Sequence, residues 1–156
     1  MSYANILAEL KSELNEIIPT DSSTFVTIGN VHDYVRVQNM DNTRITFKKN
    51  GAVCPEWFLT RTQARSELEN QPVKRQHTFI LRGYYPVNDT NETEKKFQGL
   101  VEDILNHFNW LDTLNAKVWF EECPQLTRFE SIAIMLDGTY VHFCEITFDP
   151  VEYVTS

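Results

Sequence analysis

A histidine and a cysteine two residues apart are the first side chains that could do chemistry. His142 and Cys144 alternate along a segment typical of a β-strand, so both point to one face and could bind the same metal ion. Cys54 or Cys123 could complete such a set, but the sequence lacks the paired short spacings of structural zinc sites. A buried free cysteine beside a half-buried histidine is the more common arrangement. We therefore expect no metal and no cofactor.

Paired carboxylates are the next candidates, because like charges held together can raise one pKa and serve acid–base catalysis. Glu130 and Glu145 are expected opposite each other in a C-terminal hairpin. Both fall at the open end of that hairpin, and Glu121-Glu122 falls at a strand end, where solvated carboxylates are usual. His32-Asp33 is adjacent in sequence, and adjacent strand residues point to opposite faces. We predict no catalytic residue and no enzyme activity.

The basic residues gather around the central strands and the loop between them. Trp57, Tyr84 and Tyr85 lie nearby, and basic with aromatic side chains can hold single-stranded nucleic acid. The chain carries 14 Lys and Arg against 22 Asp and Glu, a net charge of -8, which disfavours nucleic-acid and anionic-membrane binding. We interpret the basic residues as one face that meets an acidic face of a neighbouring copy. They are Arg61, Arg65, Lys74, Arg75 and Arg82.

Length and composition fit one globular domain over residues 1–156, with 42% hydrophobic residues to form its core. Only five glycines occur, and no glycine-rich phosphate-binding loop is present in the sequence. Three widely spaced cysteines do not form a disulfide pattern. The N-terminus lacks a secretory signal pattern, and no apolar run reaches the roughly 20 residues that cross a bilayer. A reducing cytoplasm is the expected compartment.

Two helices are predicted from apolar residues at helical spacing. The first covers residues 3–17 and ends before Pro19. The second begins at Asn91, with Glu94 as its capping-box partner, and carries an apolar stripe from Phe97 to Phe108.

The remaining segments predict strands, at residues 24–37 (one strand or two), 56–62, 77–85, 116–121, 128–136 and 139–148. Residues 40–49 fit either a strand or a short helix. Asp137-Gly138 predicts a two-residue hairpin loop. Its register places Ile132, Ile134 and Leu136 on one face with Val141 and Phe143, and places Phe129, Ala133 and Met135 on the other with Tyr140, His142, Cys144 and Ile146. The order predicts an α+β fold, a mostly antiparallel sheet of about four to six strands packed against an N-terminal and a central helix.

Five segments in this order carry a family resemblance. They are Ile28-Gly29-Asn30-Val31-His32-Asp33-Tyr34, Trp57-Phe58-Leu59-Thr60-Arg61-Thr62, Ile80-Leu81-Arg82-Gly83-Tyr84-Tyr85, Glu94-Lys95-Lys96-Phe97-Gln98-Gly99-Leu100-Val101 and Val141-His142-Phe143-Cys144-Glu145-Ile146. The chain resembles small phage and prophage morphogenesis proteins. In length and element order it is similar to the tail-terminator (tail-completion) and head–tail joining proteins of long-tailed phages.

The resemblance implies a structural subunit that forms a ring, commonly a hexamer, and caps the tail tube. Its partners would be tail-tube and head-completion proteins, and DNA would pass through without specific binding. Such a protein works in the bacterial cytoplasm during assembly and then in the virion. The alternative function is a small monomeric adaptor that recognises another protein through a sheet edge. The residues expected at interfaces are Arg61, Arg65, Lys74, Arg75, Arg82, Trp110 and Trp119.

Overall fold

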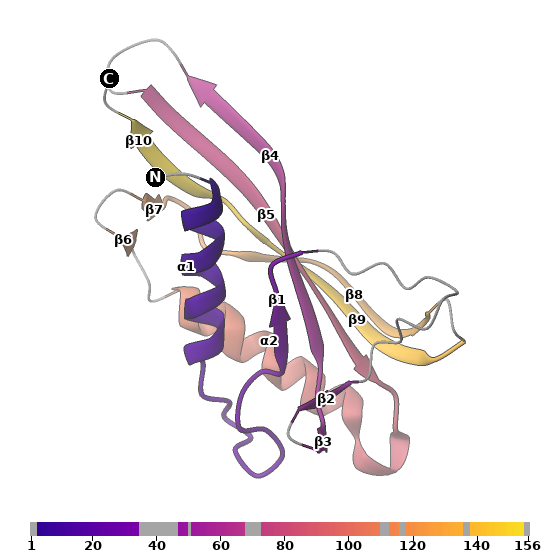
Figure 1. Cartoon of the computed structure of the whole chain (residues 1–156). Helices are drawn as coiled ribbons and strands as arrows, with labels where there is room; N and C mark the ends of the chain where they lie inside the picture. Colours follow the sequence, from indigo (N-terminus) through magenta and orange to yellow (C-terminus); the bar gives the residue numbers. More distant parts are fainter. Residues whose placement is uncertain are drawn as a thin grey trace.

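Two helices lie against one long, twisted sheet in the computed structural model (Figure 1). The structure describes residues 3–34, 47–49, 51–67, 73–109, 113–115, 118–135 and 138–154. The α+β class is confirmed by this arrangement. The part of the 40–49 segment up to residue 46 and Trp110 lie outside the described residues.

Both predicted helices are present. α1 covers Tyr3–Glu16 and α2 covers Thr93–Asn109. The predicted capping box at Asn91 is wrong, because Asn91 ends a short 3₁₀ turn, η1 (Asp89–Asn91), whose cap is Asn88. The Asn88 side chain accepts a hydrogen bond from the Asn91 backbone amide, so the asparagine three residues earlier closes the turn.

Among the residues that the structure describes, the main sheet contains eight strands, and a separate two-stranded sheet lies beside it. The main strands are β1 (Asn30–His32), β4 (Glu56–Glu67), β5 (Val73–Pro86), β6 (Thr113–Asn115), β7 (Val118–Phe120), β8 (Gln125–Ile134), β9 (Tyr140–Phe148) and β10 (Pro150–Val154). The small sheet pairs β2 (Lys48–Lys49) with β3 (Ala52–Val53). The β1–β4 pair is parallel and the other described pairs are antiparallel, so the sheet is mixed.

One interruption accounts for part of the difference between the eight strands of the main sheet and the expected number of about four to six. β9 and β10 pair with β5 in one unbroken register, from Val141 opposite Pro86 to Val154 opposite Val73. Asp149 alone separates them. They therefore act as one bent strand along the whole of β5.

The main core lies between the helices and one face of the sheet, which we call the helix face. Leu59, Leu81 and Ile146 are fully buried there. The helices contribute the buried residues Ile6, Leu10, Leu14, Phe97, Leu100, Ile104 and Phe108. A smaller cluster of Phe47, Phe58 and Val141 covers the opposite face, the outer face. Apolar residues on both faces of β4, β5 and β9 follow from this double cover.

Residues 24–28, where a strand was expected, form turns and bends instead. The Asp21 carboxylate accepts hydrogen bonds from the Thr24 backbone amide and the Ser23 hydroxyl. The Asp21 carbonyl also accepts from the Phe25 amide. These local bonds fold the chain back before β1 begins, so the β-branched residues there do not enter the sheet.

The C-terminal hairpin forms, but its predicted register is wrong. The Met135 amide donates to the Thr139 carbonyl, so the loop closes one residue earlier on the first strand than the two-residue turn requires. Further register shifts occur in β8 between Leu126 and Arg128 and between Glu130 and Ala133. Ala133 consequently pairs with Val141 on the outer face. Phe129 lies on the helix face with Cys144, and only this shared face was predicted.

Candidate interaction surfaces

The five basic residues do not share one face of the sheet. Arg61 pairs with Phe79, a helix-face residue. Arg75 lies on the same face, because residues two apart on a strand share a face and Arg75 is four residues before Phe79. Lys74, Arg82 and Arg65 fall on the outer face, since they occupy the opposite set of strand positions. The interpretation of a single basic face is therefore wrong. Lys74 and Arg75 are consecutive residues of β5 and so point to opposite faces. An extra residue in β4 between Arg61 and Gln63 also reverses the alternation there and separates Arg61 from Arg65.

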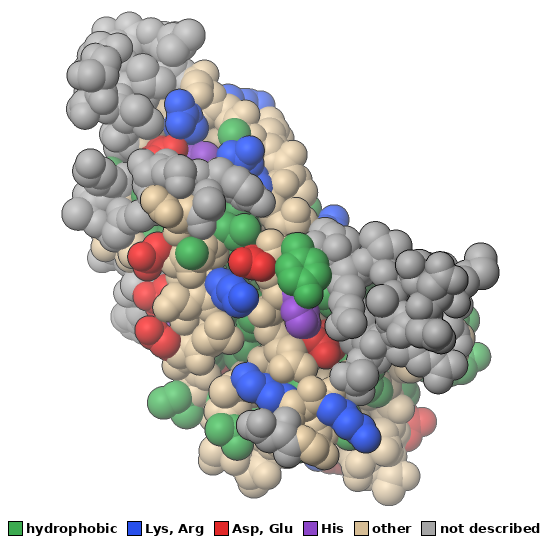
Figure 2. Space-filling view, viewed as in Figure 1, with side chains coloured by type: hydrophobic (Ala, Val, Ile, Leu, Met, Phe, Trp, Pro, Cys, Tyr) green, Lys and Arg blue, Asp and Glu red, His purple; other side chains and the backbone are tan. Residues whose placement is uncertain are grey.

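Carboxylates within the chain pair with three of these basic groups. Lys74 lies 3.0 Å from Glu121, Arg82 lies 3.3 Å from Glu145, and Arg75 lies 3.4 Å from Glu152. In the view of Figure 2 the Lys and Arg side chains are scattered among acidic and polar groups. Each internal pair reduces the positive charge that this surface can offer to a partner.

The predicted Glu130–Glu145 pair is wrong because of the shifted hairpin register. Arg128 pairs with Glu145 across the strands, and Glu130 pairs with Phe143. Arg128 Nε donates to Glu130 at 3.0 Å, and the Arg128 guanidinium lies 5.3 Å from the Phe143 ring centre. Arg128 therefore lies between the two carboxylates, which do not face each other as a pair.

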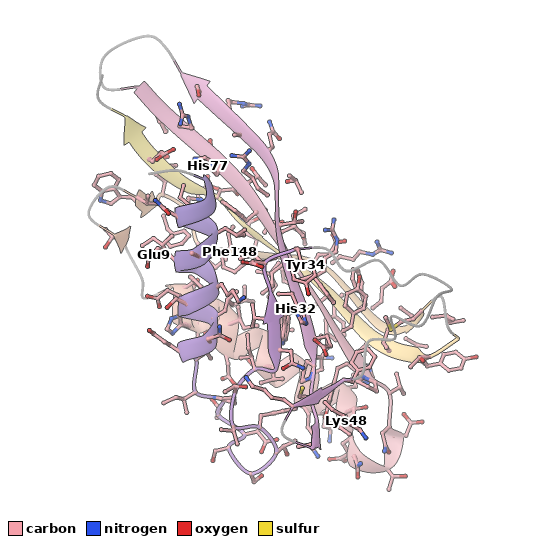
Figure 3. The ribbon with its side chains drawn as sticks, viewed as in Figure 1. Glu9, His32, Tyr34, Lys48, His77 and Phe148 are labelled. Carbon is pink, nitrogen blue, oxygen red and sulfur yellow. The ribbon has the colours of Figure 1, made fainter. Side chains whose placement is uncertain are left out.

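His32 has a carboxylate partner, but it is Glu56 on the neighbouring strand (Figure 3 labels His32). The His32 Nε2 lies 2.7 Å from Glu56 Oε2, and Asn30 Nδ2 donates to Glu56 Oε1 at 3.0 Å. Glu56 is buried, and the His32 ring stacks on Phe58. The same Asn30 amide donates to the Lys48 carbonyl, so this cluster joins β1, β4 and β2. Its arrangement fixes the parallel strand in place.

His142 and Cys144 do lie on one strand face, as predicted, and both are buried. His142 Nδ1 lies 2.5 Å from the Ser131 carbonyl, and Nε2 lies 2.7 Å from the Thr93 hydroxyl. A carbonyl only accepts, so Nδ1 donates to Ser131. Nε2 forms its hydrogen bond with the Thr93 hydroxyl, which also lies 3.2 Å from the Asn88 carbonyl. Both nitrogens are thus used to join β9 to β8 and α2. The described residues hold no group of three His, Cys, Asp or Glu placed to bind one metal ion.

The three cysteines differ in accessibility. Cys123 is exposed, whereas Cys54 and Cys144 are buried. Burial raises the pKa of the Cys144 thiol to about 12 and also raises the pKa of Cys54. Neither buried thiol is suited to act as a nucleophile near neutral pH.

An apolar patch on the C-terminal hairpin is exposed to solvent. Ile132, Ile134 and Tyr140 expose 64%, 67% and 57% of their surface, and Ile134 pairs directly with Tyr140. The hydroxyl of Ser131 donates to Glu94, which places the patch beside the first turn of α2. We call these three residues the hairpin patch. Clustered exposed apolar side chains are typical of protein-binding surfaces.

A shallow apolar groove of about 270 Å³ lies elsewhere on the chain, between the loop after α1 and β3. We call it the Val26 groove. Val26 and Val53 at its rim expose 89% and 55% of their surface, and Lys49 borders it. It is lined by Thr24, Phe25, Val26, Thr27, Lys49, Ala52, Val53 and Cys54. Sequence reasoning missed this groove and the role of Glu56, because both arise from segments brought together only by the fold.

Trp119 is partly exposed on β7, where it pairs with Val151 of β10. Its placement at an interface stays a prediction. No protein-family model matches the chain, and no curated protein matches it in sequence. Within the described ranges, neither helix combines the length and apolarity that crossing a bilayer requires.

Proposed function

We propose that the protein is a structural subunit of a phage or prophage tail, a tail-terminator or head–tail joining protein that forms a ring. The hairpin patch is the observation that supports this proposal most directly. Ile132, Ile134 and Tyr140 stand exposed on an ordered two-stranded element, where solvation offers them no stabilisation. A partner surface that covers them would remove this apolar area from water and so favour assembly.

The placement of the reactive groups also supports a structural role. The His32–Glu56 and His142–Thr93 contacts both join separate elements of the fold. Glu56, His142 and Thr93 are buried. Side chains committed to such contacts rigidify a subunit. A rigid subunit is what a ring built from repeated identical contacts requires.

The charge is consistent with a channel through which DNA moves. A net charge of -8 gives the duplex little to bind, and the pairs of Lys74, Arg75 and Arg82 with carboxylates reduce the local positive charge further. In this proposal the ring joins tail-tube and head-completion proteins, and it acts in the bacterial cytoplasm before it becomes part of the virion.

The proposal is tested by measuring mass and binding together. Light scattering after size-exclusion chromatography gives the mass of the purified protein, and cosedimentation with tail tubes of the encoding phage gives its binding. We expect a closed oligomer, either alone or on the tube. A protein that stays monomeric and also fails to sediment with tubes would contradict the proposal.

A monomeric adaptor is the second candidate, and the edge of β8 favours it. Among the described strands, β8 pairs with β9 alone, so its other edge can accept an added strand. This function predicts a monomer that forms a one-to-one complex with its partner. The same light-scattering measurement distinguishes it from a ring.

A further inference from the structure

We propose that the hairpin patch of one copy docks into the Val26 groove of the next copy, in a head-to-tail contact. This inference deepens the proposed assembly function and rests on it, because it names the two surfaces that meet. The two surfaces lie at different places on the chain. The hairpin patch is on the β8–β9 hairpin, and the Val26 groove is at the loop beside β3 (Figure 1).

The chemistry of the two surfaces matches. The hairpin patch presents two isoleucines and a tyrosine. The groove presents Val26 and Val53, and buried Phe25 lies beneath them in its lining. At about 270 Å³ the groove is smaller than the roughly 300–1,000 Å³ of small-molecule sites. It is open at its rim and suits inserted aliphatic side chains better than an enclosed ligand.

Charges at the borders are complementary as well. Glu94 lies next to the hairpin patch, where its carboxylate accepts from Ser131 and from Gln98. Lys49 borders the groove, and its ammonium donates to the Thr27 hydroxyl at 3.4 Å. Among the described residues no carboxylate forms an ion pair with Lys49. A second copy can therefore bring Glu94 towards Lys49 while the apolar surfaces meet.

The location of the two surfaces determines the symmetry of the contact. A patch that binds a different patch on an identical chain makes a heterologous contact, which closes into a ring or continues as a filament. Every copy in a closed ring has both surfaces covered. This explains why one small subunit carries both the exposed hairpin patch and the exposed Val26 groove.

The decisive test uses one variant on each surface. Ile134→Asp places a charge in the hairpin patch, and Val53→Asp places a charge in the Val26 groove. Both positions are exposed, so both variants are expected to fold. Each charge buried in the contact should weaken self-association about 30-fold or more. Leu126→Asp is the matched control, because Leu126 is an exposed apolar residue of β8 outside the hairpin patch. Self-association of the control should equal that of the unmodified chain.

Mixing the two variants gives the sharper result. The Ile134→Asp chain keeps an intact Val26 groove, and the Val53→Asp chain keeps an intact hairpin patch. These two intact surfaces can bind each other, so the mixture should form one-to-one dimers that cannot grow. Sedimentation velocity measures this, on tail tubes if the unmodified chain assembles only there. Unchanged assembly of both variants would overturn the docking contact and leave the assembly function standing. Failure of the unmodified chain to assemble, free or on tubes, would overturn both.

Discussion

The Trp57 indole lies directly against the backbone of Gly83 on the neighbouring strand. A Cβ atom added at residue 83 would stand 2.2 Å from Cζ3 of Trp57. Trp57 is fully buried, stacks on Phe97 of α2 and donates its indole N–H to the Ile28 carbonyl at 2.7 Å. One glycine on β5 thus allows a single tryptophan to join the sheet, α2 and the loop before β1.

Gly83→Ala should lower the free energy of unfolding by about 3 kcal/mol, because the tryptophan cannot move away from the added methyl group without disturbing the core. Urea denaturation followed by tryptophan fluorescence measures the loss. Gly99→Ala is the control, since a Cβ there meets nothing within 4 Å and the residue is in a helix. That change should stabilise the protein by about 0.5–1 kcal/mol. Equal stability of the two variants would contradict the packing described for Trp57.

Thr93→Val should destabilise the protein by about 2 kcal/mol, because it leaves the buried Nε2 of His142 without its partner. The Thr93 hydroxyl bonds His142 Nε2 at 2.7 Å and accepts from the Asn88 amide at 2.8 Å. Thr93→Ser keeps the hydroxyl and should stay closer to the unmodified chain. Thermal unfolding compares the three proteins. A valine variant as stable as the serine variant would show that the hydroxyl contributes nothing.

One thiol should react rapidly with a thiol reagent at pH 8 in the folded protein. Cys123 is exposed, whereas burial holds the thiols of Cys54 and Cys144 in the neutral form by raising each pKa. Absorbance of the released thiolate counts the reacting groups, and the buried two should react only after denaturation. Cys123→Ser should abolish the rapid phase. Rapid reaction of two or three thiols would contradict the burial of Cys54, of Cys144 or of both.

Glu152→Gln should cost about 2 kcal/mol at pH 7, because it weakens a buried charge-assisted hydrogen bond with His77 at 2.9 Å. Burial acts to raise the pKa of Glu152, but hydrogen bonds, including the one from His77, outweigh it and lower the pKa below 4.5. A carboxyl with a lowered folded-state pKa stabilises the protein above its unfolded-state pKa, and this stabilisation is lost as the pH falls through the folded-state value. The difference between the two proteins should therefore shrink below pH 4.5.

Urea unfolding at a series of pH values from about 3 to about 7, which lie on both sides of 4.5, measures that difference. Glu121→Gln is the control, because Glu121 pairs with Lys74 at an exposed site and exposed pairs contribute little. A gap between Glu152→Gln and the unmodified chain that does not depend on pH would contradict the assigned pKa direction.

Local sequence patterns predicted those parts of the fold that depend on local spacing. The apolar stripes of α1 and α2 and the continuous apolar character of β5 correspond to elements of the structure. The hairpin register was not predictable, because the loop closure between Met135 and Thr139 and the irregularity between Glu130 and Ala133 together move Glu130 from Glu145 to Phe143. These shifts occur in the pairing of β8 with β9, and the Asp137-Gly138 dipeptide does not indicate them.

The candidate surfaces were less predictable than the fold. The basic residues lie on β4 and β5, as predicted, but on both faces. Strand alternation separates Lys74 from Arg75, and the irregularity after Arg61 separates Arg61 from Arg65. The partner of His32 is Glu56, 24 residues away, and only the parallel pairing of β1 with β4 brings them together. A parallel pair between distant short segments has no local signal, in contrast to a hairpin.

Electron microscopy of tail tubes grown with and without the protein tests the central claim most directly. A tail terminator binds one end of a tube and stops its growth. We therefore predict density at a single end of each tube and shorter tubes as more protein is added, with Ile134→Asp losing both effects. Binding along the whole tube, or tube lengths that do not change at saturating protein, would contradict the assignment.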